Sequence, residues 1–244
     1  MSQFNDSEDP RRRQVIQTLG LGALSLAAPY NTASAFSFFG NKPEKLPEGQ
    51  SVFRLTGSAS VNDIAVTENT LIRPGDRVKT GKNSELVFAV GTQAMVLRDE
   101  AELVIESPAD DLTSMIIAGL YLITGKLLSV SRDTPMQVRT VTATIGIRGT
   151  GWYMEADPEQ TYFCTCYGTT DIVADKDGEQ LTVAATHHDQ PVYILGENES
   201  GKSIRKAPFI NHTDQELMLI ETLVGRTPPF IFPKDDYSAP RLDY

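Results

Sequence analysis

From Ser51 to about residue 195 the chain repeats one pattern, in which short runs of β-branched and apolar residues alternate with Gly, Asn and Asp turns. The segment RVKTGKNSELVFAVGTQAMVLRDEAELVIES, residues 77–107, is an example. Such a rhythm predicts one strand about every 8 to 12 residues, as in sandwiches and stacked β-rungs. Helical periodicity is nearly absent here. We therefore expect a mainly β fold, either stacked-rung or sandwich-like.

A helix is predicted only near the C-terminus. Thr213 and Glu216 have the spacing of a capping box, and Gly225 provides a stop signal. Apolar residues follow the cap at helical spacing: Leu217, Ile220, Leu223 and Val224. These features predict one helix within residues 211–226 that packs on the sheet. The remaining residues, 227–244, contain four prolines and are predicted to be an extended tail.

The N-terminal 35 residues have the organisation of a signal peptide. Three arginines at Arg11–Arg13 precede a mildly apolar run, Val15–Ala28, and the small residues Ala33–Ala35 follow. Arg12 and Arg13, followed by one free position and two apolar residues, resemble the twin-arginine export signal. An ordinary secretory signal is the alternative. Both predict a bacterial protein that is periplasmic or secreted.

The apolar run is too short for a permanent membrane anchor, because crossing the hydrocarbon core takes about 20 apolar residues. We expect no stable membrane span once the signal peptide is cleaved. Residues 36–50 contain two prolines and two glycines and are predicted to be a linker. The β-domain is then expected at 51–210. A formal net charge of −10 disfavours nucleic acid as a partner. A cell-envelope protein or a small ligand is the expected partner.

Two stretches of the sequence stand out: Leu71–Gly81, LIRPGDRVKTG, followed by the predicted strand Ser84–Val90, and Val141–Thr150, VTATIGIRGT. They resemble the periplasmic FecR-type (iron-dicitrate sensor-like) domain, over a span of about Val52–Val173. The resemblance implies a β-rich sensing, binding or scaffolding module. In that family the domain belongs to regulators that pass a signal from an outer-membrane transporter to a sigma factor through a membrane-spanning helix. Only ten residues precede the arginines here, so we expect a stand-alone exported module.

The two cysteines of the chain, Cys164 and Cys166, lie one residue apart in YFCTCYG. Residues i and i+2 of a strand face the same side, so the two thiols are expected to be neighbours. Four interpretations stay open: core packing, a metal site, thiol redox chemistry, and a strained disulfide. A metal site would use both thiols with His187 or His188, a set suited to zinc or copper(I). His212, beside the predicted helix cap, is expected to play no part.

An enzyme is a further alternative, with Cys166 as nucleophile and His188 as base. No third, orienting group is recognisable in the sequence, so we expect a protein that is not an enzyme. Arg148 lies between glycines in the second FecR-like stretch, where it could grip a partner's carboxylate. The alternative for Arg148 is structural: it could pin neighbouring strands through backbone carbonyls or form an ion pair with Glu155 or Asp157.

Overall fold

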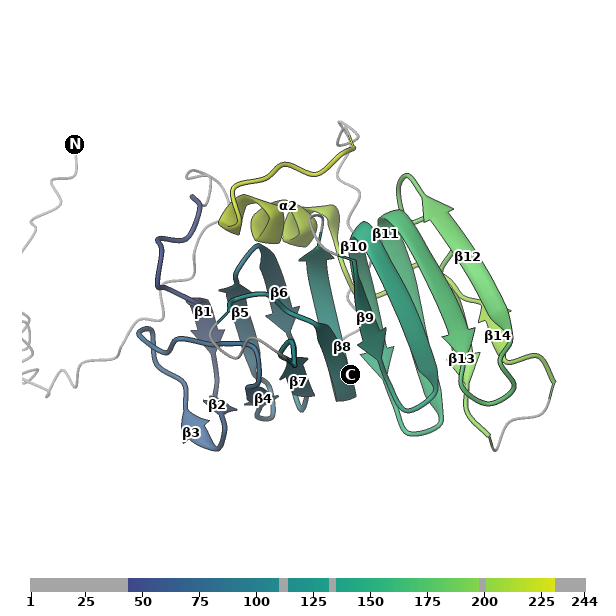
Figure 1. Ribbon diagram of the computed structural model, residues 1–244, viewed down its shortest axis with the longest axis horizontal. Coiled ribbons are helices and arrows are strands. Elements are labelled where there is room, and N and C mark those ends of the chain that lie inside the picture. Colours follow the sequence, from purple (N-terminus) through teal and green to yellow (C-terminus); the bar gives the residue numbers. More distant parts are fainter. Residues whose placement is uncertain (1–43, 110–113, 132–134, 198–200, 231–244) are drawn as a thin grey trace, which may run out of the picture. The chain divides into compact units, whose positions relative to one another are not determined.

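The computed structural model describes residues 44–109, 114–131, 135–197 and 201–230. The predicted signal peptide, residues 36–43 of the linker and residues 231–244 of the tail lie outside these ranges. Within them, the chain forms a 14-stranded sheet and one helix (Figure 1). The mainly β fold with a C-terminal helix is therefore confirmed. None of the described helical residues forms a segment long and apolar enough to cross a membrane.

The strands follow one another along the chain with the bounds β1 (Val52–Thr56), β2 (Ala59–Val61), β3 (Ile64–Ala65), β4 (Arg77–Thr80), β5 (Glu85–Val90), β6 (Gln93–Leu97), β7 (Glu102–Glu106), β8 (Gly119–Ser131), β9 (Met136–Arg139), β10 (Ala143–Ala156), β11 (Gln160–Ala174), β12 (Gln180–Ala185), β13 (Val192–Leu195) and β14 (Ile204–Lys206). The helix is α2 (Asp214–Leu223). Every described strand pair is antiparallel except β8 with β9, which is parallel.

Apolar residues on the two faces of the strands pack into two separate clusters. In β5, Leu86 and Phe88 belong to one cluster, whereas Val87 and Ala89 belong to the other. We call the first cluster the inner core. Strands from β1 to β13 contribute residues to it. The second, the outer core, includes residues of α2 and of the adjoining segment 207–230. The alternation seen in the sequence thus places apolar side chains on both faces of these strands.

The three longest strands each change partner partway along their length. Strand β8 pairs with β7 up to Thr124 and with β10 from Gly125, and β11 pairs with β13 up to Phe163 and with β12 from Gly168. Both glycines have positive φ, which side chains other than glycine rarely adopt. Because these long strands change pairing partner, residues of β7, β9 and β12 join residues of β5 and β6 in one inner core.

Helix α2 packs beside β6 and β8 on the outer core (Figure 1). The capping box predicted from the sequence is confirmed, because Thr213 accepts from the Glu216 backbone while the Glu216 side chain accepts from the Thr213 backbone. Glu216 also forms an ion pair with Arg98, 2.9 Å away. At the other end, the Leu46 N–H donates to the Leu223 carbonyl at 2.9 Å. The last part of the predicted linker therefore lies against the helix.

Gly168→Ala should destabilise the protein, because the position has φ +91° and a Cβ there would lie 2.6 Å from the Gly149 carbonyl oxygen. We expect the free energy of unfolding, measured by urea denaturation, to fall by about 1 to 3 kcal/mol. Gly146→Ala is the matched control in β10, where φ is ordinary and the nearest atom is 3.7 Å away. Equal stability of the two variants would contradict the role assigned to Gly168.

Candidate metal centre

Strand β11 presents both thiols to the outer core. Cys164 and Cys166 are fully buried in that cluster, whereas Phe163 packs in the inner core. Neither cysteine is in a disulfide. The alternation of the strand thus brings the thiols to one face, as the sequence predicts.

His188 comes from the turn between β12 and β13. The Asp189 carboxylate accepts from the Thr186 backbone at 2.6 Å and from its hydroxyl at 2.9 Å, which closes the turn. His188 has a positive φ of 52°, and its N–H donates to the Cys166 carbonyl at 2.9 Å. That backbone bond fixes the imidazole next to the strand that carries the thiols.

His212 immediately precedes the N-cap of α2 and is fully buried. Its ring stacks on Tyr153, with centroids 4.4 Å apart. Its Nδ1 donates to the Ile210 carbonyl at 2.7 Å, and the preceding Asn211 donates to Glu155 at 2.7 Å. These contacts aim Nε2 of His212 at the thiols.

The four side chains form a compact group, which we call the Cys/His cluster: Cys164, Cys166, His188 and His212. Their ligand atoms all lie within 4.8 Å of one another, and all four residues are buried. Cys164 Sγ is 3.6 Å from His188 Nδ1, and Cys166 Sγ is 3.4 Å from His212 Nε2. The two imidazole nitrogens are 3.1 Å apart.

The outward nitrogen of each imidazole is bound to an acceptor. His188 Nε2 lies 3.0 Å from Asp214 Oδ1, and His212 Nδ1 binds the Ile210 carbonyl. A carbonyl or an ionised carboxylate only accepts, so these outward nitrogens carry the protons. A protonated ring donates from its inward nitrogen to a thiolate, whereas in neutral rings, the form that binds a metal, the inward nitrogens are lone pairs directed into the cluster. This is the arrangement of metal-binding histidines, whose second N–H is held by a carboxylate or a backbone carbonyl.

The charges of the surrounding groups favour a metal-binding thiolate. Burial raises the pKa of Cys164, but hydrogen bonds from Cys166, His188 and His212 outweigh it and hold that pKa well below its ordinary value. Burial and the neighbouring Cys164 raise the pKa of Cys166. Burial opposes ionisation of Asp214, yet hydrogen bonds from His188 and His187 lower its pKa. Cys164 is therefore the thiol most easily deprotonated.

The structure differs from the sequence prediction in its choice of histidines. His187 is excluded from the Cys/His cluster; its Nε2 contacts Asp214 at 3.0 Å and its side chain is 30% exposed. With His188 and Asp214 it forms a second group of potential ligands. His212, expected to play no part, lies inside the cluster. Cys166 and His212 are 46 positions apart, so no local pattern reveals this contact.

The structure also supplies the third group that the enzyme alternative lacked, but beside Cys164 and not beside the proposed nucleophile Cys166, whose Sγ contacts His212. Cys164, His188 and Asp214 lie in the order thiol, imidazole and carboxylate, with the distances given above. However, neither thiol has exposed surface. Phe209 and Phe230 pack on the His188 ring, with centroids 4.3 and 6.5 Å away. A nucleophile has to be reached by its substrate, and this one is covered.

Arg148 lies apart from the Cys/His cluster and 67% of its side chain is exposed. Its ion-pair partner is Asp171 on β11, so the predicted pairing with Glu155 or Asp157 was wrong. Asp171 also accepts from Thr182 on β12 at 2.8 Å. A hydrogen bond from Thr182 and the charge of Arg148 lower the pKa of Asp171. Arg148 thus links two strands and remains accessible to a partner.

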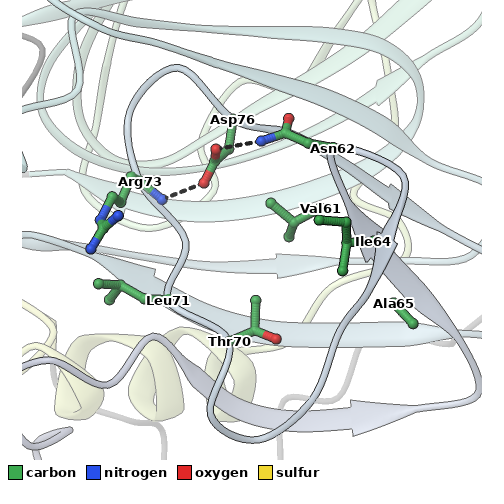
Figure 2. A pocket seen from close by; sticks show the side chains of 8 residues that line it. All are labelled: Val61, Asn62, Ile64, Ala65, Thr70, Leu71, Arg73 and Asp76. Atoms are coloured by element: carbon green, nitrogen blue, oxygen red, sulfur yellow. Dashed lines mark hydrogen bonds between the residues drawn. The ribbon is translucent and has the colours of Figure 1, made fainter.

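A surface pocket adjoins the first FecR-like stretch (Figure 2). Asp76 organises it by accepting from the Arg73 N–H and from the Asn62 side chain, both at 2.7 Å. The rest of its lining is largely apolar: Val61, Ile64, Ala65, Thr70 and Leu71. No residue of the Cys/His cluster borders it.

Neither a family model nor a curated protein matches this chain. Two solved structures are similar to it, both described as a "putative anti-sigma factor" from Parabacteroides distasonis ATCC 8503. The first, at 2.50 Å resolution, has 15% identity and a TM-score of 0.42 over 54% of this chain and 58% of that one. The second, at 1.65 Å, has 15% identity and a TM-score of 0.43 over 67% and 82%. This chain thus spans somewhat more than half of the first of these proteins.

The burial of both thiols predicts that a maleimide reagent will not label Cys164 or Cys166 in the native protein, because neither has exposed surface. Unfolding in denaturant with a chelator should release two labelled thiols per chain, counted by mass spectrometry. Rapid native labelling would contradict the buried cluster and would favour the nucleophile alternative.

Proposed function

We propose that this chain is a zinc-binding β-module of the bacterial cell envelope. The observation that carries the proposal is the Cys/His cluster, in which two buried thiols and two imidazole lone pairs converge. Without a cation, the thiols of Cys164 and Cys166 offer the imidazole nitrogens only weak S–H donors, and the two nitrogens still face each other at 3.1 Å. A metal ion satisfies all four groups at once.

The spacing of the ligands supports tetrahedral coordination. With Zn–S of about 2.3 Å and Zn–N of about 2.05 Å, a tetrahedron has S–N edges of about 3.6 Å and an N–N edge of about 3.3 Å. The corresponding distances in the cluster are 3.6, 3.4 and 3.1 Å. These three distances lie within a few tenths of an ångström of the tetrahedral edges, and all the ligand atoms lie within 4.8 Å of one another.

Charge favours zinc over copper(I). Two thiolates and Zn²⁺ form a neutral unit with two neutral imidazoles, whereas copper(I) would leave one negative charge. An unbalanced charge is costly in a fully buried site. Four protein ligands also leave no position open for substrate, which is typical of structural rather than catalytic zinc. We accordingly propose a role in binding rather than in catalysis.

The setting of this role is proposed from the sequence. The signal-like N-terminus supports export to the periplasm or beyond, and the two FecR-like stretches support a sensing, binding or scaffolding module. The exposed guanidinium of Arg148, in the second of these stretches, is the group we propose for contact with a carboxylate of an envelope protein or small ligand.

Elemental analysis of protein purified from zinc-replete cells should find one zinc per chain.

Of the three histidine variants, His188→Ala and His212→Ala should lower zinc affinity at least tenfold, because each removes a ligand. His187→Ala is the matched control and should retain zinc, since His187 lies outside the cluster. Cobalt(II) substitution should give the intense thiolate-to-metal absorption of a tetrahedral site. Metal-free protein, or loss confined to His187→Ala, would contradict the proposal.

Export is tested separately. Replacing Arg12 and Arg13 by lysine should block export through the twin-arginine route and leave the protein in the cytoplasm. Fractionation of cells with an antibody to the β-domain measures this, with the lysine variant compared against the native chain. Normal periplasmic accumulation of the variant would exclude that route.

A further inference from the structure

The ligands of the proposed zinc site come from three separate parts of the chain. Cys164 and Cys166 lie on β11 and His188 lies in the β12–β13 turn, so these three belong to the β-sheet and its connections. His212 alone belongs to the C-terminal segment, which we define as residues 207–230. An ion in the Cys/His cluster would therefore tie this segment to the sheet.

We infer that zinc acts as a clasp that controls how tightly the C-terminal segment is held on the outer face of the sheet. The inference rests on the proposed zinc site and adds its regulatory consequence. His212 directly precedes the N-cap Thr213, and Asp214, which binds the outward nitrogen of His188, is the first residue of α2. Ligation thus acts at the very start of the helix.

Several contacts hold the helix without any metal. Glu216 pairs with Arg98 at 2.9 Å, and further along Glu221 accepts from the Tyr167 hydroxyl and from Arg226. The apolar residues of α2 are also buried in the outer core: Leu217, Leu219, Ile220 and Leu223. The segment consequently has two sources of affinity for the sheet, of which zinc controls one.

Loss of zinc weakens the start of the helix in particular. The emptied cluster would keep only weak hydrogen bonds from the two thiols, with the imidazole nitrogens of His188 and His212 facing each other at 3.1 Å and no ion between them. Undocking exposes His212 to water and removes this conflict. Removal of zinc therefore shifts the segment toward an undocked state, while the inner core keeps its own packing.

The thermodynamic linkage between zinc binding and docking of the C-terminal segment gives the size of the change in the undocked population. A ligand at 100 times its Kd lowers the population of a non-binding state about 100-fold. The undocked state keeps Cys164, Cys166 and His188 and so retains some zinc affinity, which reduces the factor. We expect zinc to lower the undocked population about 10-fold to 100-fold.

Hydrogen exchange measures this directly on the full chain. A chelator should speed amide exchange in α2 about 10-fold to 100-fold, including the Leu217 N–H that donates to Thr213. Amides of the β4–β7 pair, whose fully buried apolar side chains all belong to the inner core, should exchange at an unchanged rate. In His212→Ala the exchange of α2 should no longer respond to zinc, because the clasp lacks its ligand on the helix side.

A pair of Leu→Ala variants provides a second measurement. Leu223→Ala weakens docking at the far end of α2, nine residues or about 14 Å from the helix start. This variant should be cleaved by protease within the C-terminal segment when zinc is chelated and should resist cleavage when zinc is added. Leu120→Ala, the matched change in the inner core, should show no zinc dependence in this segment.

The outcomes separate the clasp from the zinc site. If zinc binds stoichiometrically but chelation leaves exchange in α2 unchanged, or speeds it equally throughout the domain, the clasp is wrong and the zinc site stands. A zinc response of α2 that persists in His212→Ala also overturns the clasp. If elemental analysis finds no zinc in the native chain, both the clasp and the proposed function fail.

Discussion

The packing of the C-terminal segment on the outer face of the sheet is the contact on which the rest of the structure depends. It covers apolar side chains of β5, β6, β8 and β11 that would otherwise face water, and it delivers His212 to the thiols of β11. A sheet with apolar residues on both faces has to be covered on both. The same burial that stabilises the helix therefore also completes the Cys/His cluster.

The strand pairing of the sheet produces this outer apolar face. Because β8 and β11 change partners at Gly125 and Gly168, one set of strands closes the inner core from both sides. Residues 125–131 of β8, 150–156 of β10 and 160–167 of β11, which lie side by side, keep a second apolar face that becomes part of the outer core. Tyr153 and Cys164, paired across β10 and β11, then lie beneath the segment that leads into α2.

Electrostatics decides what the buried polar groups of this region can do. The outward nitrogens of His188 and His212 are each bound to an acceptor, so in neutral rings the inward nitrogens have no proton to donate. Two thiols beside two lone pairs form only weak S–H hydrogen bonds but a good ligand set. This contrast, more than the presence of cysteine and histidine alone, is why we propose a metal centre rather than a core that happens to contain four such residues.

Local pattern by itself determined the strands, the capping box of α2 and the placement of both thiols on one face, because alternation, capping and the two-residue period of a strand act between near neighbours. It pointed to His187 or His188 and could not choose between them, since the choice depends on the φ of a turn. Only the tertiary structure brought His212 to the thiols and Asp214 to His188, and paired Arg148 with Asp171. These contacts join residues 23 to 46 positions apart, and no local rule records which distant segments a folded sheet will cover.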